Sequence, residues 1–225
     1  MKYTIVLADI DNTLFDFNAD SYEALEKAFC EFSLPFHETT WEEYHAVNQA
    51  LWKEYEEGKI EKKTIYPTRF ARYLALKGLS ADAEKLNACY MEYLAQGSNI
   101  FPQTKTLLET LRDMGVRVYG ATNGSTVVQK ARMVRSGLAH LFQKSFISEE
   151  MGHQKPTREY YDLIFAELGE ENRKNAIMLG DSLSSDMQGG RNAGIATCYI
   201  GKDDPHDARC DYVIHELMEF PQILL

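Results

Sequence analysis

The stretch Ile5-Val6-Leu7-Ala8-Asp9-Ile10-Asp11-Asn12-Thr13 decides the fold class, because a short apolar run ends abruptly at two carboxylates. The run from Tyr3 to Ala8 is typical of a strand that is buried on both faces. Three more runs of this kind follow: Val116 to Ala121, Ala176 to Gly180 and Ile195 to Ile200. Helical spacing of apolar residues separates these runs, and this alternation predicts a doubly wound parallel α/β sheet.

Two weaker segments, Ser145 to Ser148 and Tyr212 to Ile214, are expected to add short strands. The connection between the first two strands is different, because it covers roughly 80 residues and far exceeds a crossover helix. Its apolar residues keep helical spacing, which predicts several antiparallel helices. We therefore expect a helical domain of residues 17–96, inserted into an α/β core of residues 1–16 and 97–225.

Composition restricts the class of partner and the compartment. The formal charge of −10 disfavours a nucleic acid as partner, because binding a phosphate backbone relies on clustered Lys and Arg. No charged segment precedes a long apolar run at the N-terminus, and no stretch approaches the roughly 20 apolar residues of a membrane span. The four cysteines are far apart and show no CxxC spacing, so buried thiols and a cytoplasmic protein are expected.

Polar residues follow the predicted strands or precede a core helix at four places, and the carboxyl ends of parallel strands line a ligand crevice. These places hold Asp9 and Asp11, then Thr122-Asn123-Gly124, then Lys155-Pro156, and finally Gly180-Asp181-Ser182 with Asp186. Each cluster alone has an ordinary structural explanation, since Asp, Asn and Thr make turns and helix caps and most lysines are solvated. Their shared position at one sheet edge favours a single site.

The acidic residues in this set point to a metal. Mg²⁺ prefers oxygen ligands and bridges carboxylates to a substrate phosphate, which suits Asp9, Asp11 and Asp181. A bound cation would also supply the positive charge that an acidic protein needs to accept an anionic substrate.

The order DxDxT, strand-end Thr, Lys-Pro and GDSxxxD resembles the haloacid dehalogenase superfamily over essentially the whole chain. The resemblance implies a Mg²⁺-dependent phosphatase with a helical cap, acting on a small-molecule phosphate monoester. It implies Asp9 as nucleophile, Asp11 as general acid and base, and Thr122, Asn123, Gly124 and Lys155 as phosphoryl contacts. The resemblance also implies a metal site formed by Asp9, Asp11, Asp181 and Asp186, in which Asp186 either contacts the metal directly or orients Lys155 or a metal-bound water. An aspartate at position 11 disfavours carbon–halogen cleavage.

Within the predicted insertion, residues 46–60 resemble the cap of pyrimidine 5′-nucleotidases, which implies a nucleoside monophosphate as substrate. Aromatic residues such as Trp52 at helical spacing also fill helix-bundle cores, and that alternative stays open. A sugar-phosphate phosphatase or phosphomutase of the same superfamily is a second possibility. A signalling receiver domain is disfavoured. A chain that resembles a receiver is shorter and has its phosphorylated Asp after a later strand, whereas here the DxD motif follows the first strand and a long insertion comes after it.

Overall fold

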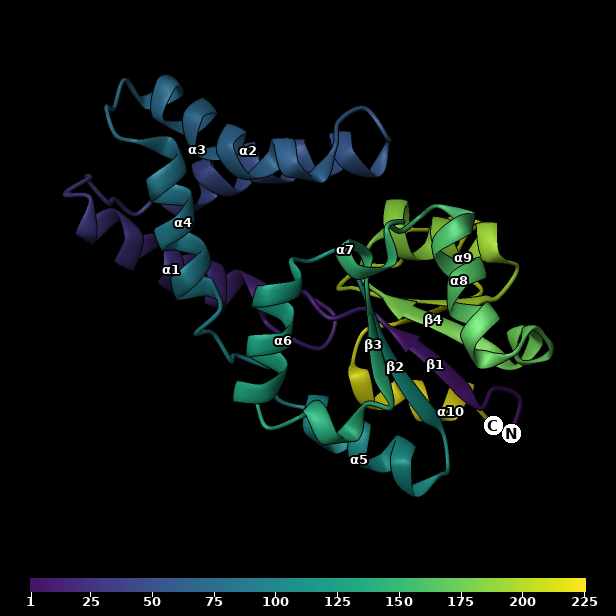
Figure 1. The fold of residues 1–225 in the computed structure, drawn as a ribbon. Coiled ribbons are helices and arrows are strands. Elements are labelled where there is room, and N and C mark those ends of the chain that lie inside the picture. The colour runs from purple at the N-terminus through teal and green to yellow at the C-terminus, as the bar shows by residue number, and fades with distance from the viewer. The chain divides into compact units, whose positions relative to one another are not determined.

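The computed structural model describes residues 1–225 and contains a six-stranded parallel sheet in the order β3-β2-β1-β4-β5-β6 (Figure 1). The strands are β1 Ile5–Ala8, β2 Arg117–Thr122, β3 Lys144–Ile147, β4 Ala176–Gly180, β5 Ala196–Ile200 and β6 Tyr212–Ile214. All neighbouring pairs are parallel, and Ile5 of β1 pairs with Arg117 on one side and Ala176 on the other. The doubly wound fold class is confirmed, including the two short strands.

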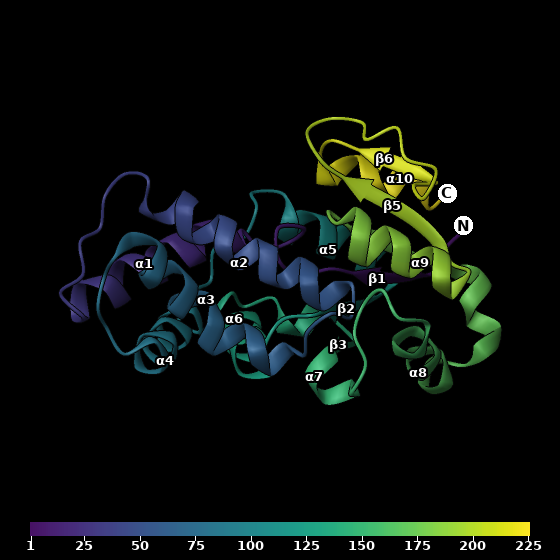
Figure 2. The ribbon, with the colours of Figure 1, turned by 90° about the horizontal axis from the view of Figure 1, so that it is seen from above.

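Helices cover both faces of the sheet (Figures 1 and 2). The helices of this part are α5 Thr104–Asp113, α6 Thr126–Arg135, α7 Ser148–Met151, α8 Arg158–Leu168, α9 Gln188–Ala193 and α10 Phe220–Ile223. Side chains of β1 alternate between the faces: Val6 and Ala8 pack in the cluster that contains α5 and α10, whereas Ile5 and Leu7 pack against α8. Burial on both faces explains the uninterrupted apolar runs of the central strands.

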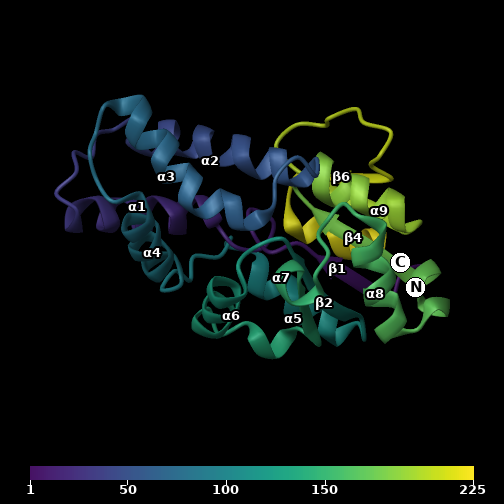
Figure 3. The same cartoon turned by 45° about the horizontal axis from the view of Figure 1, so that its top comes forward.

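The chain divides into two compact units, residues Met1–Phe17 with Ser98–Leu225 and residues Asn18–Gly97. The second unit is helical and is formed by α1 Phe17–Glu31, α2 Thr40–Glu56, α3 Lys62–Lys77 and α4 Ala83–Leu94. Helices α2 and α3 lie side by side within it (Figure 3), and α3 also packs against α4. Its interior is aromatic, with Tyr44 stacked on Phe70 and both rings beside Tyr90.

The structure corrects the expectation of buried thiols. All four cysteines are free, but only Cys198 is buried; Cys30 is exposed, and Cys89 and Cys210 are partly exposed. Cys198 lies on a central position of β5, whereas Cys30 is on an outward-facing position near the end of α1, where helical spacing does not require burial. No helix of the chain combines the length and the apolar character needed to cross a membrane.

Candidate active site

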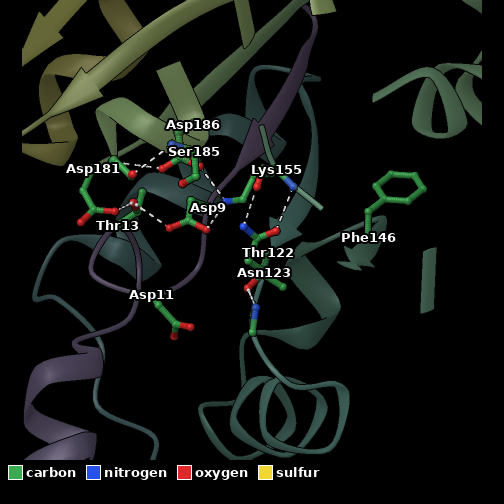
Figure 4. Close-up of polar contacts among 12 residues, drawn as sticks. Asp9, Asp11, Thr13, Thr122, Asn123, Phe146, Lys155, Asp181, Ser185 and Asp186 are labelled. Atoms are coloured by element: carbon green, nitrogen blue, oxygen red, sulfur yellow. Dashed lines mark hydrogen bonds and ion pairs between the residues drawn. The ribbon is translucent and has the colours of Figure 1, made fainter. Parts of the chain in front are cut away.

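The predicted polar residues gather at the carboxyl ends of β1, β2 and β4 (Figure 4). The chain leaves β1 toward β2 on one side and later returns to β4 on the other, so the strand order reverses at β1. Such a reversal opens a crevice beyond the strand ends, and ligands of open α/β sheets bind there. Asp9 follows β1 and Asp181 follows β4, which places both carboxylates at this crevice.

Lys155 lies between two carboxylates at the centre of the site. Its Nζ atom donates to Asp9 Oδ1 and to Asp186 Oδ1, each at 2.6 Å. Both Lys155 and Asp186 are almost completely buried. The Asp186 position is set by the loop after β4, where Ser182 N donates to Asp186 Oδ2 at 3.1 Å. This loop continues as one π-helical turn, Leu183–Met187, a form common at functional sites.

The charges of the site shift the ionisation of its members. Burial raises the pKa of Asp9 well above its usual range, even though the Lys155 ammonium acts in the opposite direction. Burial and then the neighbouring Asp186 raise the pKa of Asp181 to about 7. Burial lowers the pKa of Lys155, but the charges of Asp186 and Asp9 outweigh this effect and the net pKa is raised. Strongly perturbed groups in a crevice are typical of catalytic sites.

Asp9, Asp181 and Asp186 form an acidic group in which one potential ligand atom from each lies within 4.8 Å of the others. Thr13 Oγ1 bridges part of this group, donating to Asp181 Oδ1 at 3.2 Å and to Asp9 Oδ2 at 3.4 Å. A single ammonium compensates three carboxylates here, of which Asp9 and Asp186 are buried and Asp181 is partly exposed, so negative charge is in excess. Oxygen donors with unbalanced negative charge fit a hard divalent cation such as Mg²⁺.

Thr122 and Asn123 lie at the end of β2 beside this group (Figure 4). Thr122 Oγ1 accepts a hydrogen bond from Gly124 N at 2.9 Å. The Asn123 side chain exchanges two hydrogen bonds of 2.9 Å with the Lys155 backbone, one through Nδ2 to the carbonyl and one from the amide to Oδ1. Asn123 therefore fixes the segment that carries Lys155.

The structure does not bring the Asp11 carboxylate into the acidic group. In Figure 4 its side chain points away from Asp9 and Asp181. It is instead bound by helix α6: Gln129 Nε2 donates to Asp11 Oδ2 at 2.6 Å, and Arg132 forms an ion pair with Oδ1. Of the other predicted residues, Lys155, Asp181 and Asp186 lie around Asp9.

Sequence reasoning missed three residues of the site: Thr13, Gln129 and Arg132. Thr13 was visible as the last position of the DxDxT pattern, but nothing in the sequence linked its hydroxyl to Asp181. Gln129 and Arg132 lie 118 and 121 residues from Asp11 in the chain. Their separation of three residues on one helix face is an ordinary pattern, so no local signal identified them.

Comparison with known proteins identifies the family that this geometry represents. The family model described as haloacid dehalogenase-like hydrolase matches residues 3–194. The chain belongs to the haloacid dehalogenase-like hydrolases. The predicted family is therefore confirmed, and so is the prediction of a phosphoric monoester hydrolase at the level of the enzyme class.

Three relatives of this hydrolase cover nearly its whole length. It is 36% identical to the pyrimidine 5′-nucleotidase PynA of Streptococcus pneumoniae, over 92% of this chain and 86% of PynA. It is 31% identical to the pyrimidine 5′-nucleotidase YjjG of Escherichia coli, over 100% of this chain and 99% of YjjG. The crystal structure of the HAD-hydrolase YfnB from Bacillus subtilis bound to magnesium matches with a TM-score of 0.93 and 32% identity, over 100% and 99% of the two chains.

Proposed function

We propose that this hydrolase is a Mg²⁺-dependent 5′-nucleotidase that hydrolyses pyrimidine nucleoside monophosphates, deoxy forms included, through a phospho-aspartate on Asp9. The observation that carries the proposal is the contact of Asp9 with Lys155 inside the acidic group, at the crevice where the strand order reverses. PynA and YjjG, both named pyrimidine 5′-nucleotidases, support the substrate class.

The chemistry divides hydrolysis into two steps at one phosphorus atom. A carboxylate oxygen of Asp9 forms a bond to phosphorus while the bond to the ester oxygen breaks, and Asp11 gives that oxygen a proton. Water then attacks the phospho-aspartate, Asp11 takes a proton from the water, and phosphate leaves. Lys155 and the Thr122 hydroxyl stabilise the negative charge that develops on the phosphoryl oxygens.

Mg²⁺ held by Asp9, Asp181 and Asp186 would offset the repulsion between these carboxylates and a phosphate dianion. The YfnB structure, which is bound to magnesium, supports magnesium as the cation. The Asp186 side chain accepts hydrogen bonds from Lys155 Nζ and from Ser182 N, and it also belongs to the acidic group. The proposal therefore keeps both of its roles: it orients the ammonium and would help to hold the metal.

The inserted helical unit is proposed to select the substrate. Its structure limits which residues of the segment 46–60 have side chains that are free to contact a substrate. Asn48 is buried and accepts a hydrogen bond from Arg69 Nη1 at 3.4 Å. Tyr55 is buried with Leu51 and Ile65, as expected for a helix-bundle core. Trp52 is only partly buried, and it remains the aromatic candidate for contact with a base.

Steady-state kinetics on matched concentrations of dUMP, dTMP, UMP, AMP, UDP and glucose 6-phosphate tests the proposal. We expect the highest kcat/KM for the pyrimidine monophosphates, and a lower value for UDP because its extra charge meets no second cluster of basic residues. Asp9→Asn provides the matched inactive control, since an amide lacks the charge for attack while circular dichroism should show an intact fold. A clear preference for the hexose phosphate would contradict the nucleotidase proposal and favour a sugar-phosphate phosphatase. If Asp9→Asn turned over substrate at a rate close to that of the wild type, Asp9 could not be the nucleophile.

A further inference from the structure

Helix α6 binds both oxygens of the Asp11 carboxylate. Gln129 Nε2 donates to one oxygen at 2.6 Å and the Arg132 guanidinium pairs with the other. Hydrogen bonds between a guanidinium and a carboxylate are among the strong ones in proteins. The position of this carboxylate, apart from the acidic group, is therefore specified by two side chains of one helix.

The two side chains are themselves held in place. The Arg132 guanidinium is fully buried, lies 5.3 Å from the centre of the Phe15 ring, and donates to Gln129 Oε1 at 3.2 Å. Gln129 is also buried, and its Nε2 donates a second hydrogen bond to Thr122 Oγ1 at 2.9 Å. A connected and buried network of this kind restricts each member to one rotamer.

Close packing strengthens this restriction. A Cβ atom added at Gly124 would lie 2.3 Å from Gln129 Nε2, so the backbone that follows Thr122 rests directly on the Gln129 amide. The network thus joins Asp11 to the residue proposed to contact the phosphoryl group.

Charge explains why Asp11 needs such a support. Asp11 is only two residues from Asp9, and an unrestrained carboxylate there would be attracted to a dication bound by the acidic group. As an additional metal ligand, Asp11 would lose contact with the ester oxygen. The ion pair with Arg132 supplies a positive charge that competes with the metal for the Asp11 carboxylate.

We propose that Arg132 and Gln129 are positioning residues that hold the Asp11 carboxylate out of the metal's coordination shell and beside Thr122, where it serves the ester oxygen. This inference rests on the proposed phosphatase chemistry and assigns the orientation of its acid–base residue to helix α6. A purely structural ion pair, which only anchors the loop to α6, is the alternative that the test must exclude.

The first test uses Arg132→Met and Gln129→Leu, with Arg135→Met as the matched control because Arg135 is exposed on the same helix. A nucleoside monophosphate has a poor leaving group that needs a proton, whereas p-nitrophenyl phosphate has a good one. For both test variants we expect kcat/KM to fall on the order of tenfold to a hundredfold with the nucleotide. We expect it to change less than about threefold with p-nitrophenyl phosphate, since acid catalysis contributes little there. Equal losses on both substrates, or no loss, would overturn the proposal.

The second test measures Mg²⁺ binding by calorimetry without substrate. If the substitution releases Asp11 toward the metal, Gln129→Leu should bind Mg²⁺ several-fold more tightly than the wild type. Because Gln129 is neutral, its replacement does not change the charge of the site, and a change of charge therefore cannot explain tighter binding. Unchanged or weaker binding contradicts the proposed orientation. If Arg132→Met does not fold, the results for Gln129→Leu alone test the proposal.

A double-mutant cycle separates positioning from anchoring. In an Asp11→Asn background, Arg132→Met and Gln129→Leu should cost no further activity with the nucleotide, because the group that they orient is gone. A further loss of the original size would show that they act elsewhere and overturns the inference. A wild-type protein that hydrolyses no phosphate ester would instead refute the proposed function, and with it this inference.

Discussion

At the scale of single residues, Lys155 supplies the positive charge that partly balances the carboxylates of the site. It is a buried ammonium between two carboxylates, and each partner accepts one hydrogen bond from it. Burying such charges is expensive, and the expense is offset only while all partners are present. The residue therefore contributes to stability, and under the proposed function it also supplies positive charge to the phosphoryl group.

We predict that Lys155→Met loses turnover and lowers the free energy of unfolding by about 3–5 kcal/mol, because Asp9 and Asp186 are left as uncompensated buried carboxylates. Urea denaturation measures the loss. Lys144→Met is the matched control, since Lys144 pairs with Glu167 at 2.6 Å in a half-exposed position, and it should cost less than about 1 kcal/mol. Similar losses in the two variants would show that the site has no special charge balance.

At the scale of elements, the end of β4 is shaped by the absence of a side chain at Gly180. A Cβ atom there would lie 2.2 Å from Asp186 Oδ2 and 2.4 Å from its Cγ. The strand end and the π-helical turn after it can approach each other only because this position is glycine. The approach brings Asp186 to Lys155.

Gly180→Ala should therefore displace Asp186 and lower Mg²⁺ affinity and kcat on the order of tenfold to a hundredfold, as changes around metal ligands commonly do. Calorimetric titration with Mg²⁺ measures the affinity. Gly120→Ala serves as control, because its Cβ would meet Ser145 Oγ at 2.7 Å and Ile10 Cδ1 at 3.2 Å in the same sheet, and neither side chain belongs to the acidic group. The control is expected to lose stability and keep its Mg²⁺ affinity; if both variants bind Mg²⁺ like the wild type, the role assigned to Gly180 is wrong.

For the whole molecule, the acidic group exists only when the core is folded, because Asp9 and Asp181 lie in two segments of that unit that the inserted residues Asn18–Gly97 separate in the sequence. An unfolded chain cannot present them together, so a metal that binds here stabilises the folded state. The excess of negative charge in the group increases the stabilisation that a bound cation gives to the folded state.

Chelation by EDTA should abolish turnover and lower the Tm, and added Mg²⁺ should restore both. At a Mg²⁺ concentration a hundred times Kd the stabilisation is about 2.7 kcal/mol. Thermal unfolding followed by circular dichroism, with NaCl at equal ionic strength as control, measures the effect. Full activity in the chelator would refute the metal assignment.

The sequence by itself determined the parallel sheet, its strand-end residues and the family, because these depend on local patterns. Apolar runs of four to six residues reflect burial on both faces, and the motif DxDxT is contiguous. Asp9, Lys155, Asp181 and Asp186 could be assembled from the rule that parallel strands share a carboxyl edge.

Only the tertiary structure decided the orientation of Asp11 and the partners that hold it. Its contacts with Gln129 and Arg132 join residues more than a hundred positions apart, and they depend on how α6 packs beside the β1 loop. The same holds for Asn123, whose side chain binds the Lys155 backbone. The sequence shows which groups reach the sheet edge, but packing selects the rotamer of each group, and rotamers determine which carboxylates can share a cation.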